Sequence, residues 1–429
     1  MIRHLRLIVA VLAVGLVGAG LFFFWPHPLD PVNPSASQPM GEALIARGRY
    51  LTTAADCAAC HTTKGGQPFA GGVAFKLPFG TIYSSNITPD REHGIGAWDD
   101  AEFVRAVKTG VGKHGENLYP AFPYTSYALL STDDVLAIRA YLATLAPSST
   151  PSRANDLMFP FNQRFVLRGW NLLFLSGKPF EPDSSQSQAW NRGSYLVNGL
   201  AHCSECHSPR NVLFGRESDN ALAGGLVDGW KAWNITSDKE TGIGNWTDQA
   251  LISYLHQGYA VGHGAASGGM REAVDLSLSH LPRSDIEDMV AYLRTVPARK
   301  TDVAAAVVAK SPAVAASQKW APAPGAPEGT GRRVFESACV SCHAWDGHGQ
   351  QSIRAGLSGA HPVNDPAGAN LVRVILQGSH GSDGSVATSM PSFGAAYTDA
   401  EIAALSNYVI AQFSGKAATV TAEQVRQAR

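Results

Sequence analysis

The first strongly patterned segment of the chain is an uncharged, apolar run from Leu7 to Trp25. At about 1.5 Å per residue, a helix of this length reaches roughly 28 Å, close to the thickness of the bilayer hydrocarbon. Arg3 and Arg6 precede the run, so the positive-inside rule places the N-terminus in the cytoplasm and the rest of the chain outside. We predict a membrane anchor over residues 1–26. A cleaved signal peptide is the alternative.

Beyond the anchor, three segments have apolar residues at helical spacing behind polar helix starts. These starts are Thr132-Asp133-Asp134, Ser284-x-x-Glu287 and Thr398-x-x-Glu401. The last two have the form of capping boxes. Each of these closing helices holds a tyrosine, and each expected opening helix upstream holds a glycine: Tyr141, Tyr292 and Tyr408, with Gly48, Gly193 and Gly331. A bare backbone at the glycine lets two helices cross closely, with the aromatic ring at the crossing.

This pattern predicts an all-α fold with three domains in tandem behind the N-terminal helix. We place the domains at residues 42–146, 188–297 and 327–415, with a linker at 27–41 and a C-terminal tail at 416–429. The connector over 147–187 is apolar and aromatic, so we expect it to pack against the protein. The connector over 298–326 is rich in alanine and proline, which predicts an extended tether.

Overall composition narrows the class of function. The chain is 45% apolar and 9% aromatic, as globular proteins are, and its 34 basic residues balance its 35 acidic ones. The net charge is therefore close to zero and gives no indication that nucleic acid is a partner.

The cysteines carry the clearest chemistry, since all six fall in three Cys-x-x-Cys-His motifs. The motifs are Cys57-Ala58-Ala59-Cys60-His61, Cys203-Ser204-Glu205-Cys206-His207 and Cys339-Val340-Ser341-Cys342-His343. Side chains at i, i+3 and i+4 share one side of a helical turn, so two thiols can attach a porphyrin while the histidine ligates its iron. We predict three haem c groups, with these six cysteines as the covalent attachments and these three histidines as proximal ligands. The alternative is structural zinc, but zinc needs paired motifs close together.

The first two domains share a longer repeat. Asn86-Ile87-Thr88-Pro89-Asp90-Arg91-Glu92-His93-Gly94-Ile95-Gly96-Ala97-Trp98 recurs as Asn234-Ile235-Thr236-Ser237-Asp238-Lys239-Glu240-Thr241-Gly242-Ile243-Gly244-Asn245-Trp246. The third domain lacks this segment, so the first two are closer relatives of one another.

A low-spin haem of this kind usually takes a methionine on its distal side. Met270 and Met390 lie in loops marked by glycine or proline behind the second and third motifs, and we predict them as distal ligands. In the first domain Phe122 occupies the corresponding place and cannot ligate iron. Three outcomes stay open there: a five-coordinate iron, His114 as the ligand, or a distant ligand such as Met158.

Taken together, the motifs resemble those of the triheme cytochrome c subunits of bacterial membrane-bound dehydrogenases. The shared elements include the two Asn-Ile-Thr segments, the loop Leu118-Tyr119-Pro120-Ala121-Phe122-Pro123-Tyr124, Gly269-Met270 and Met390-Pro391-Ser392-Phe393. Many family members have methionine where this chain has Phe122. Phenylalanine there, together with Pro160-Phe161-Asn162-Gln163-Arg164, is similar to the type that accompanies molybdenum hydroxylases.

The resemblance implies an electron-transfer subunit rather than a catalytic one. A separate dehydrogenase subunit of flavin, quinone or molybdenum type is expected to supply electrons, and ubiquinone or a terminal oxidase to accept them. We expect the chain at the inner membrane with its haem domains facing the periplasm. The rival hypothesis is a peroxidase-like enzyme that uses an open first haem.

Overall fold

The computed structural model describes residues 2–35, 38, 40–300, 329–350, 352–382 and 387–429. The described part is mostly helical and also contains four small antiparallel sheets, which the all-α prediction did not include. The chain divides into two compact units, Met1–Pro182 with Asn198–His202, and Asp183–Val197 with Cys203–Arg429. From residue 301 onward, the predicted tether over 298–326 lies outside the described residues.

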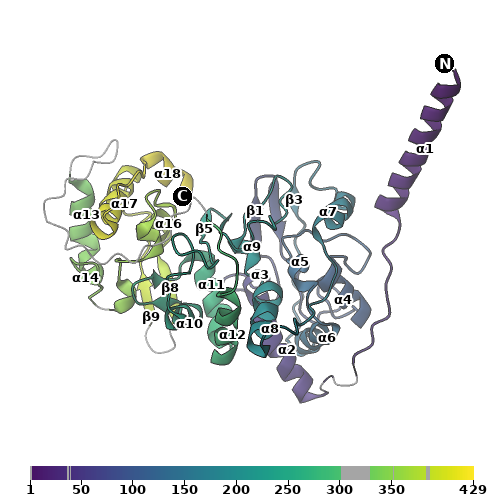
Figure 1. Cartoon of the computed structure of the whole chain (residues 1–429), viewed down its shortest axis with the longest axis horizontal. Helices are drawn as coiled ribbons and strands as arrows, with labels where there is room; N and C mark the ends of the chain where they lie inside the picture. The colour runs from purple at the N-terminus through teal and green to yellow at the C-terminus, as the bar shows by residue number, and fades with distance from the viewer. Residues whose placement is uncertain (1, 36–37, 39, 301–328, 351, 383–386) are drawn as a thin grey trace. The chain divides into compact units, whose positions relative to one another are not determined.

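Figure 1 labels many of the helices and strands of the two units. The first holds α1 (Ile2–Phe24), α2 (Glu42–Ala54), α3 (Cys57–His61), β1 (Ala74–Leu77), β2 (Gly80–Tyr83), α4 (Asp100–Thr109), α5 (Tyr124–Tyr127), α6 (Thr132–Leu142), β3 (Asp156–Leu157), η1 (Arg164–Val166) and α7 (Leu167–Phe174). The π-helical turn η2 (Leu196–Leu200) spans the boundary, with Leu196 and Val197 in the second unit and its other residues in the first. The second unit begins with α8 (Gln188–Tyr195) and continues with α9 (Ser204–His207), β4 (Gly225–Val227), β5 (Trp230–Ala232), α10 (Asp248–Gln257), β6 (Tyr259–Ala260), β7 (Gly264–Ala265), α11 (Gly268–Leu276), η3 (Leu278–His280) and α12 (Arg283–Leu293). It ends with α13 (Thr330–Ala338), α14 (Val340–His343), η4 (Ile353–Ala355), α15 (His361–Asn364), α16 (Ala369–Gln377), β8 (Ser379–Ser382), β9 (Ala387–Met390), α17 (Asp399–Ser414) and α18 (Ala422–Ala428).

Three pairs of crossing helices organise the structure: α2 with α6, α8 with α12, and α13 with α17 (Figure 1). A Cβ atom built on Gly48, Gly193 or Gly331 would overlap a backbone carbonyl of the partner helix. The same atom would lie 2.8, 3.0 and 2.9 Å from Cβ of Tyr141, Tyr292 and Tyr408, respectively. The predicted crossings with a tyrosine beside each glycine are confirmed.

The starts of the closing helices agree with the prediction in two of three cases. Thr398 and Glu401 form the predicted capping box, and α6 is capped by the Ser131 hydroxyl. The predicted box at Ser284 is wrong, because α12 starts one residue earlier, directly behind Pro282. Glu287 instead pairs with Arg283, with 2.8 Å between Oε1 and Nε. Proline presets the backbone for a helix start, so no side-chain cap is needed.

The aromatic connector after α6 packs within the first unit, as predicted. Strand β3 pairs with β2, and Leu167 is buried with Ile82 and Tyr119. In α7, Asn171 accepts a hydrogen bond of 2.7 Å from the Tyr124 hydroxyl. The opposite face of α7 remains apolar and exposed at Leu172 and Leu173.

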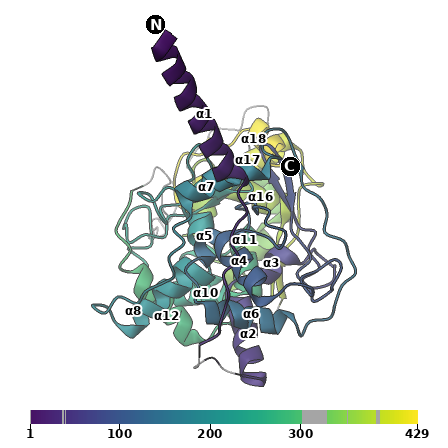
Figure 2. The same cartoon turned by 90° about the vertical axis from the view of Figure 1, so that its right-hand side faces the viewer.

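The C-terminal end of helix α1 contacts other residues of the first unit. The rings of Phe23 and Phe24 lie 6.0 and 5.2 Å from the ring of Phe165, and this end of α1 lies beside α7 (Figure 2). Its segment Arg6–Phe24 is long and apolar enough to cross a membrane. An N-terminal signal sequence meets the same criterion of length and composition.

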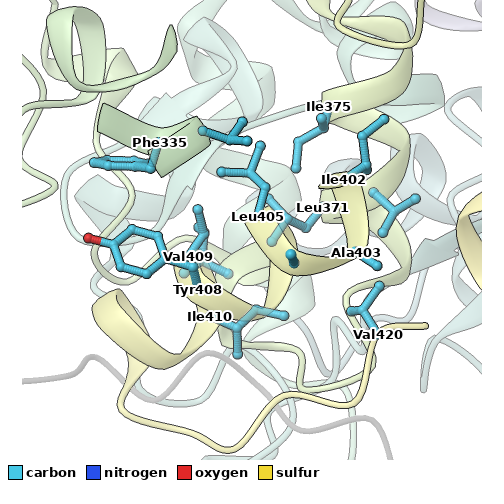
Figure 3. Packing of buried hydrophobic residues seen from close by; sticks show 14 of the residues in the cluster. Phe335, Leu371, Ile375, Ile402, Ala403, Leu405, Tyr408, Val409, Ile410 and Val420 are labelled. Carbon is cyan, nitrogen blue, oxygen red and sulfur yellow. The ribbon is translucent and has the colours of Figure 1, made fainter. Parts of the chain in front are cut away.

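The third helix pair encloses a core of its own. Phe335 of α13 lies against Tyr408 of α17, and Leu371 and Ile375 of α16 face Leu405 (Figure 3). Burial of such side chains contributes about 1.5–3 kcal/mol each.

Within the second unit, four flat rings stack on one another. Trp233 lies on His361 with 4.9 Å between ring centroids, and Trp246 lies on His361 at 5.6 Å and on His263 at 3.6 Å. Burial lowers the pKa of His361 to about 3, and the neighbouring His263 and Lys416 act in the same direction. Burial also lowers the pKa of His263 to about 4. Both imidazoles are therefore neutral in the folded protein at neutral pH.

We predict that replacing Gly193 with alanine destabilises the protein by about 3 kcal/mol, because the new methyl group overlaps the carbonyl of Asp288. Gly269→Ala in α11 is the matched control, since a Cβ there meets nothing within 4 Å. We expect that control to be neutral or to gain up to about 1 kcal/mol from helix propensity. Denaturant unfolding of both variants checks this, and equal midpoints would contradict the close crossing.

We also predict an acid-dependent loss of stability through His361. Its pKa is depressed in the folded state, whereas in the unfolded chain it is about 6.5, so the unfolded state gains protons first as the pH falls. The stability is complete above pH 6.5 and falls below it, by at most about 1.4 kcal/mol per pH unit for this group. His361→Phe should flatten the pH dependence of the unfolding midpoint between pH 6.5 and 4. An unchanged slope would contradict the assignment.

Candidate haem sites

Each Cys-x-x-Cys-His motif forms one short helical turn at the end of an opening helix. The motif histidines end α3, α9 and α14, and the two cysteines of each motif lie on the same turn or at its start. All six cysteines lie in the described part of the chain, and none forms a disulfide. The thiols therefore remain available for covalent attachment.

All three motif histidines make the same hydrogen bond. Nδ1 of His61 lies 2.7 Å from the carbonyl oxygen of Ser85, Nδ1 of His207 lies 2.6 Å from that of Trp233, and Nδ1 of His343 lies 2.6 Å from that of Ala355. A carbonyl can only accept, so Nδ1 carries the proton and donates it. The lone pair of each ring is then on Nε2, where a metal can bind.

Electrostatics agree with this tautomer. Burial lowers the pKa of His61, His207 and His343, and the carbonyl hydrogen bond opposes that effect only in part. The imidazoles are therefore neutral at pH 7, as iron ligation requires.

The first cysteine of each motif is held as a neutral thiol. Burial raises the pKa of Cys57 and Cys203 to about 12 and that of Cys339 to about 11. A structural zinc site would need several such side chains close together. Over the residues that the structure describes, no group of three or more His, Cys, Asp or Glu side chains is placed to hold a metal ion. Iron in a porphyrin needs only the histidine and the two thioethers from each motif.

The repeated Asn-Ile-Thr segment holds the carbonyl that the first two histidines use. Ser85 and Trp233 are each followed directly by a buried asparagine, Asn86 or Asn234. In both copies Oδ1 of the asparagine accepts from the backbone and hydroxyl of the threonine two residues later, at 2.7 to 2.9 Å. The side-chain amide donates to the chain that leaves the closing helix.

That last contact links the histidine to the closing helix in each copy. Asn86 donates to the carbonyl oxygens of Ser148 and Thr150 at 2.8 and 3.0 Å, beyond α6. Asn234 donates to the carbonyl of Arg299 at 2.6 Å, beyond α12. The sequence showed that the segment repeats but not what it does. The signal that could have revealed its role is the asparagine, a residue type that bonds to nearby backbone.

A second repeated contact involves the residue that follows each of the first two motif histidines. The residue after it, Thr62 or Ser208, accepts through its hydroxyl the backbone N–H of Phe69 or Leu222, at 3.1 and 3.0 Å. Phe69 and Leu222 both have a φ of 62°. Such a backbone is uncommon for large side chains and is retained where the surroundings require it.

The third site reaches the same bond by other means. The carbonyl of Ala355 comes from the 3₁₀ turn η4, whose start is fixed by the hydroxyl of Ser352. The third segment has no Asn-Ile-Thr copy. The geometry at His343 therefore does not depend on that motif.

The two predicted distal methionines do not lie in loops, as the sequence suggested, but in a helix and a strand. Met270 is half-buried in the first turn of α11, and Met390 is half-buried at the end of β9, against the third core. In the first unit, Phe122 packs its ring 5.6 Å from that of Tyr127. His114 lies exposed in a turn, where its backbone N–H donates to Glu116 at 2.9 Å. The distal assignments of Met270, Met390 and His114 stay predictions.

Comparison with known proteins now adds to this geometry. Residues 45–146 match the family described as Cytochrome c, and residues 326–409 match Cytochrome C oxidase, cbb3-type, subunit III. The fructose dehydrogenase cytochrome subunit of Gluconobacter japonicus is 38% identical over 94% of this chain and 85% of its own length. The gluconate 2-dehydrogenase cytochrome c subunit of Pantoea cypripedii is 37% identical over 92% and 91%. The chain belongs to the cytochrome c subunits of membrane-bound dehydrogenases.

A further relative of this cytochrome c subunit is a subunit of the nicotinate dehydrogenase of Pseudomonas putida. It is 38% identical over 94% of this chain, but the chain spans only 33% of that protein's length. The cofactor of the cytochrome c subunit is haem c, which supplies one-electron redox chemistry through its iron. The neutral, Nδ1-bonded histidines and the paired thiols fit that group.

We predict that Asn234→Ala perturbs the second site selectively. It leaves the buried Thr236 without its acceptor, which costs about 1–3 kcal/mol, and it frees the carbonyl of Trp233 to move. The expected result is a changed absorption spectrum and reduction potential of one haem out of the total. Asn245→Ala is the matched control, because the first copy already has alanine there, at Ala97. If both variants behave like the parent protein, the asparagine does not hold the carbonyl.

Proposed function

We propose that this cytochrome c subunit carries three haem c groups and passes electrons from the catalytic subunit of a dehydrogenase to ubiquinone or a terminal oxidase. The observation that carries the proposal is the hydrogen bond that recurs at His61, His207 and His343, each beside a Cys-x-x-Cys pair. One arrangement built three times in one chain is what a relay of single-electron carriers requires.

The domain plan belongs to the same proposal. One haem is assigned to each of the segments 42–146, 188–297 and 327–415, which contain the three crossing helix pairs. Met270 and Met390 are assigned as the distal ligands of the second and third haems. A methionine opposite histidine raises the reduction potential of the iron.

The first haem differs from the other two in this proposal. Phe122 occupies the place that corresponds to Met270, and its ring packs among tyrosines instead of offering a donor. The two distal ligands considered from the sequence, His114 and Met158, are both exposed. These contacts favour a first iron with an open sixth position over ligation by His114.

Partner and location follow from the relatives. Their names assign them to fructose, gluconate and nicotinate dehydrogenases, so the partner here is a catalytic dehydrogenase subunit of flavin, quinone or molybdenum type. Helix α1 anchors the chain in the inner membrane, and the haem domains face the periplasm, where c-type haem is attached. The apolar length of Arg6–Phe24 supports the anchor.

The first test counts the haems. We predict three haems per chain by pyridine haemochrome assay of the full-length protein matured with haem c. Replacing both cysteines of any one motif by alanine should remove one haem and leave two. Val340→Ser is the control, because that residue lies between the attachment cysteines of the third motif and its replacement should leave all three haems. A parent protein with two haems would contradict the proposal.

The second arm separates an electron carrier from a peroxidase-like enzyme. A ubiquinone analogue should oxidise the chemically reduced haems, and carbon monoxide should bind one of the reduced haems, at the open first site. Peroxide turnover should stay near the level of free haem. Rapid peroxide turnover without any dehydrogenase subunit would favour the enzyme instead.

A further inference from the structure

The loops that hold the second and third proximal histidines meet each other within the second unit. Trp233 accepts the His207 hydrogen bond through its carbonyl, and its indole ring stacks on His361 at an interplanar angle of 22°. Ala355 accepts the His343 hydrogen bond, and its neighbour Arg354 donates to the carbonyl of Gln257 at 2.8 Å. The Trp233 ring and the Arg354 side chain, at or next to the two acceptor carbonyls, thus each contact the segment that holds the other histidine.

His361 is the centre of this contact. It is the first residue of α15, beside the core of the third helix pair. Its ring stacks on those of Trp233 and Trp246, which lie in the segment between α8 and α12. The residue is buried, and its neutral state suits stacking among apolar rings. Each aromatic pair of this kind adds stability beyond the area that it buries.

Polar contacts also fix how β5 and α16 lie against each other. Asn370 of α16 accepts the backbone N–H of Lys231 and donates to its carbonyl, both at 2.9 Å, as a neighbouring strand would. The Lys231 ammonium lies 3.3 Å from the buried carboxylate of Asp365. These bonds are directional, so they allow one register between β5 and α16.

Close backbone contacts also keep the segment around Gly264 from sliding along the segment around Ala360. A Cβ built on Gly264 would lie 2.6 Å from Cβ of Ala360, and one built on Gly359 would overlap the carbonyl of Gly262. The two segments therefore touch backbone to backbone beside the ring stack. Well-packed contacts of this kind behave as rigid bodies.

We propose that His361 is a positioning residue that locks the third helix pair onto the loop holding the second proximal histidine, and so fixes the spacing of the second and third haem sites. This inference rests on the proposed function, in which those two sites exchange electrons. The rate of electron transfer between two held haems depends on their separation and on their relative orientation. A rigid contact through Trp233 protects both the spacing and the orientation of His207.

The test uses the full-length holoprotein with His361→Ala, His361→Phe and the control His348→Ala, whose side chain is 64% exposed. Three quantities are measured: haem content, the rate of electron exchange between haems after flash reduction, and hydrogen exchange at the backbone amides of residues 231–236. For His361→Ala we expect full haem content, a fall in exchange rate of about tenfold or more, and faster amide exchange. His361→Phe, which keeps a flat ring, should restore both rates, and His348→Ala should match the parent.

The outcomes separate this inference from the proposed function. Parent-like rates and amide protection in His361→Ala would overturn the positioning role while leaving three electron-carrying haems intact. A parent protein that lacks the haems would instead overturn the proposed function. If His361→Ala fails to fold, Arg354→Ala replaces it, because that side chain is only half-buried at the same contact. A smaller loss in the same direction supports the inference, and no loss in Arg354→Ala then overturns it.

Discussion

The bond between a buried imidazole and a backbone carbonyl is the constraint around which this protein is arranged. A histidine that is to bind iron must stay neutral, present Nε2 and keep its ring from rotating, and one acceptor at Nδ1 satisfies all three needs. At the first two sites, a β-hairpin leads the chain to the acceptor carbonyl and a buried asparagine ties it to the exit of the closing helix. The helix crossing, the hairpin and the loop therefore all help to position the carbonyl oxygen that accepts the histidine N–H.

Sequence patterns predicted the parts of this arrangement that depend on local spacing. The three attachment turns and the capping box at Thr398 come from residues a few positions apart. The crossing glycines and their tyrosines are far apart in the chain, and they were found because the same pattern recurs in three segments. The capping box expected at Ser284 failed because a proline two residues earlier set the start of α12. The small sheets were missed, since their strands have only two to four residues and show no clear alternation.

Other contacts between distant residues were not predicted from the sequence. The Asn234 side chain donates a hydrogen bond to the carbonyl of Arg299, 65 residues later in the chain. The His361 ring stacks on those of Trp233 and Trp246, which lie more than 100 residues earlier. A single chain gives no signal for such pairs, because each residue type has many other uses. The third site also shows that one bond can be reached by two local structures, since a 3₁₀ turn there does the work of the asparagine segment.

The glycine crossings also impose an order in time on the maturation of each domain. Cys339, Cys342 and His343 lie well before α17, the helix that must cross Gly331, along the chain. Because such a long-range contact closes a large loop, it forms late. Each attachment turn is thus accessible while its domain is still open, and arrival of the last helix then seals the chain around it.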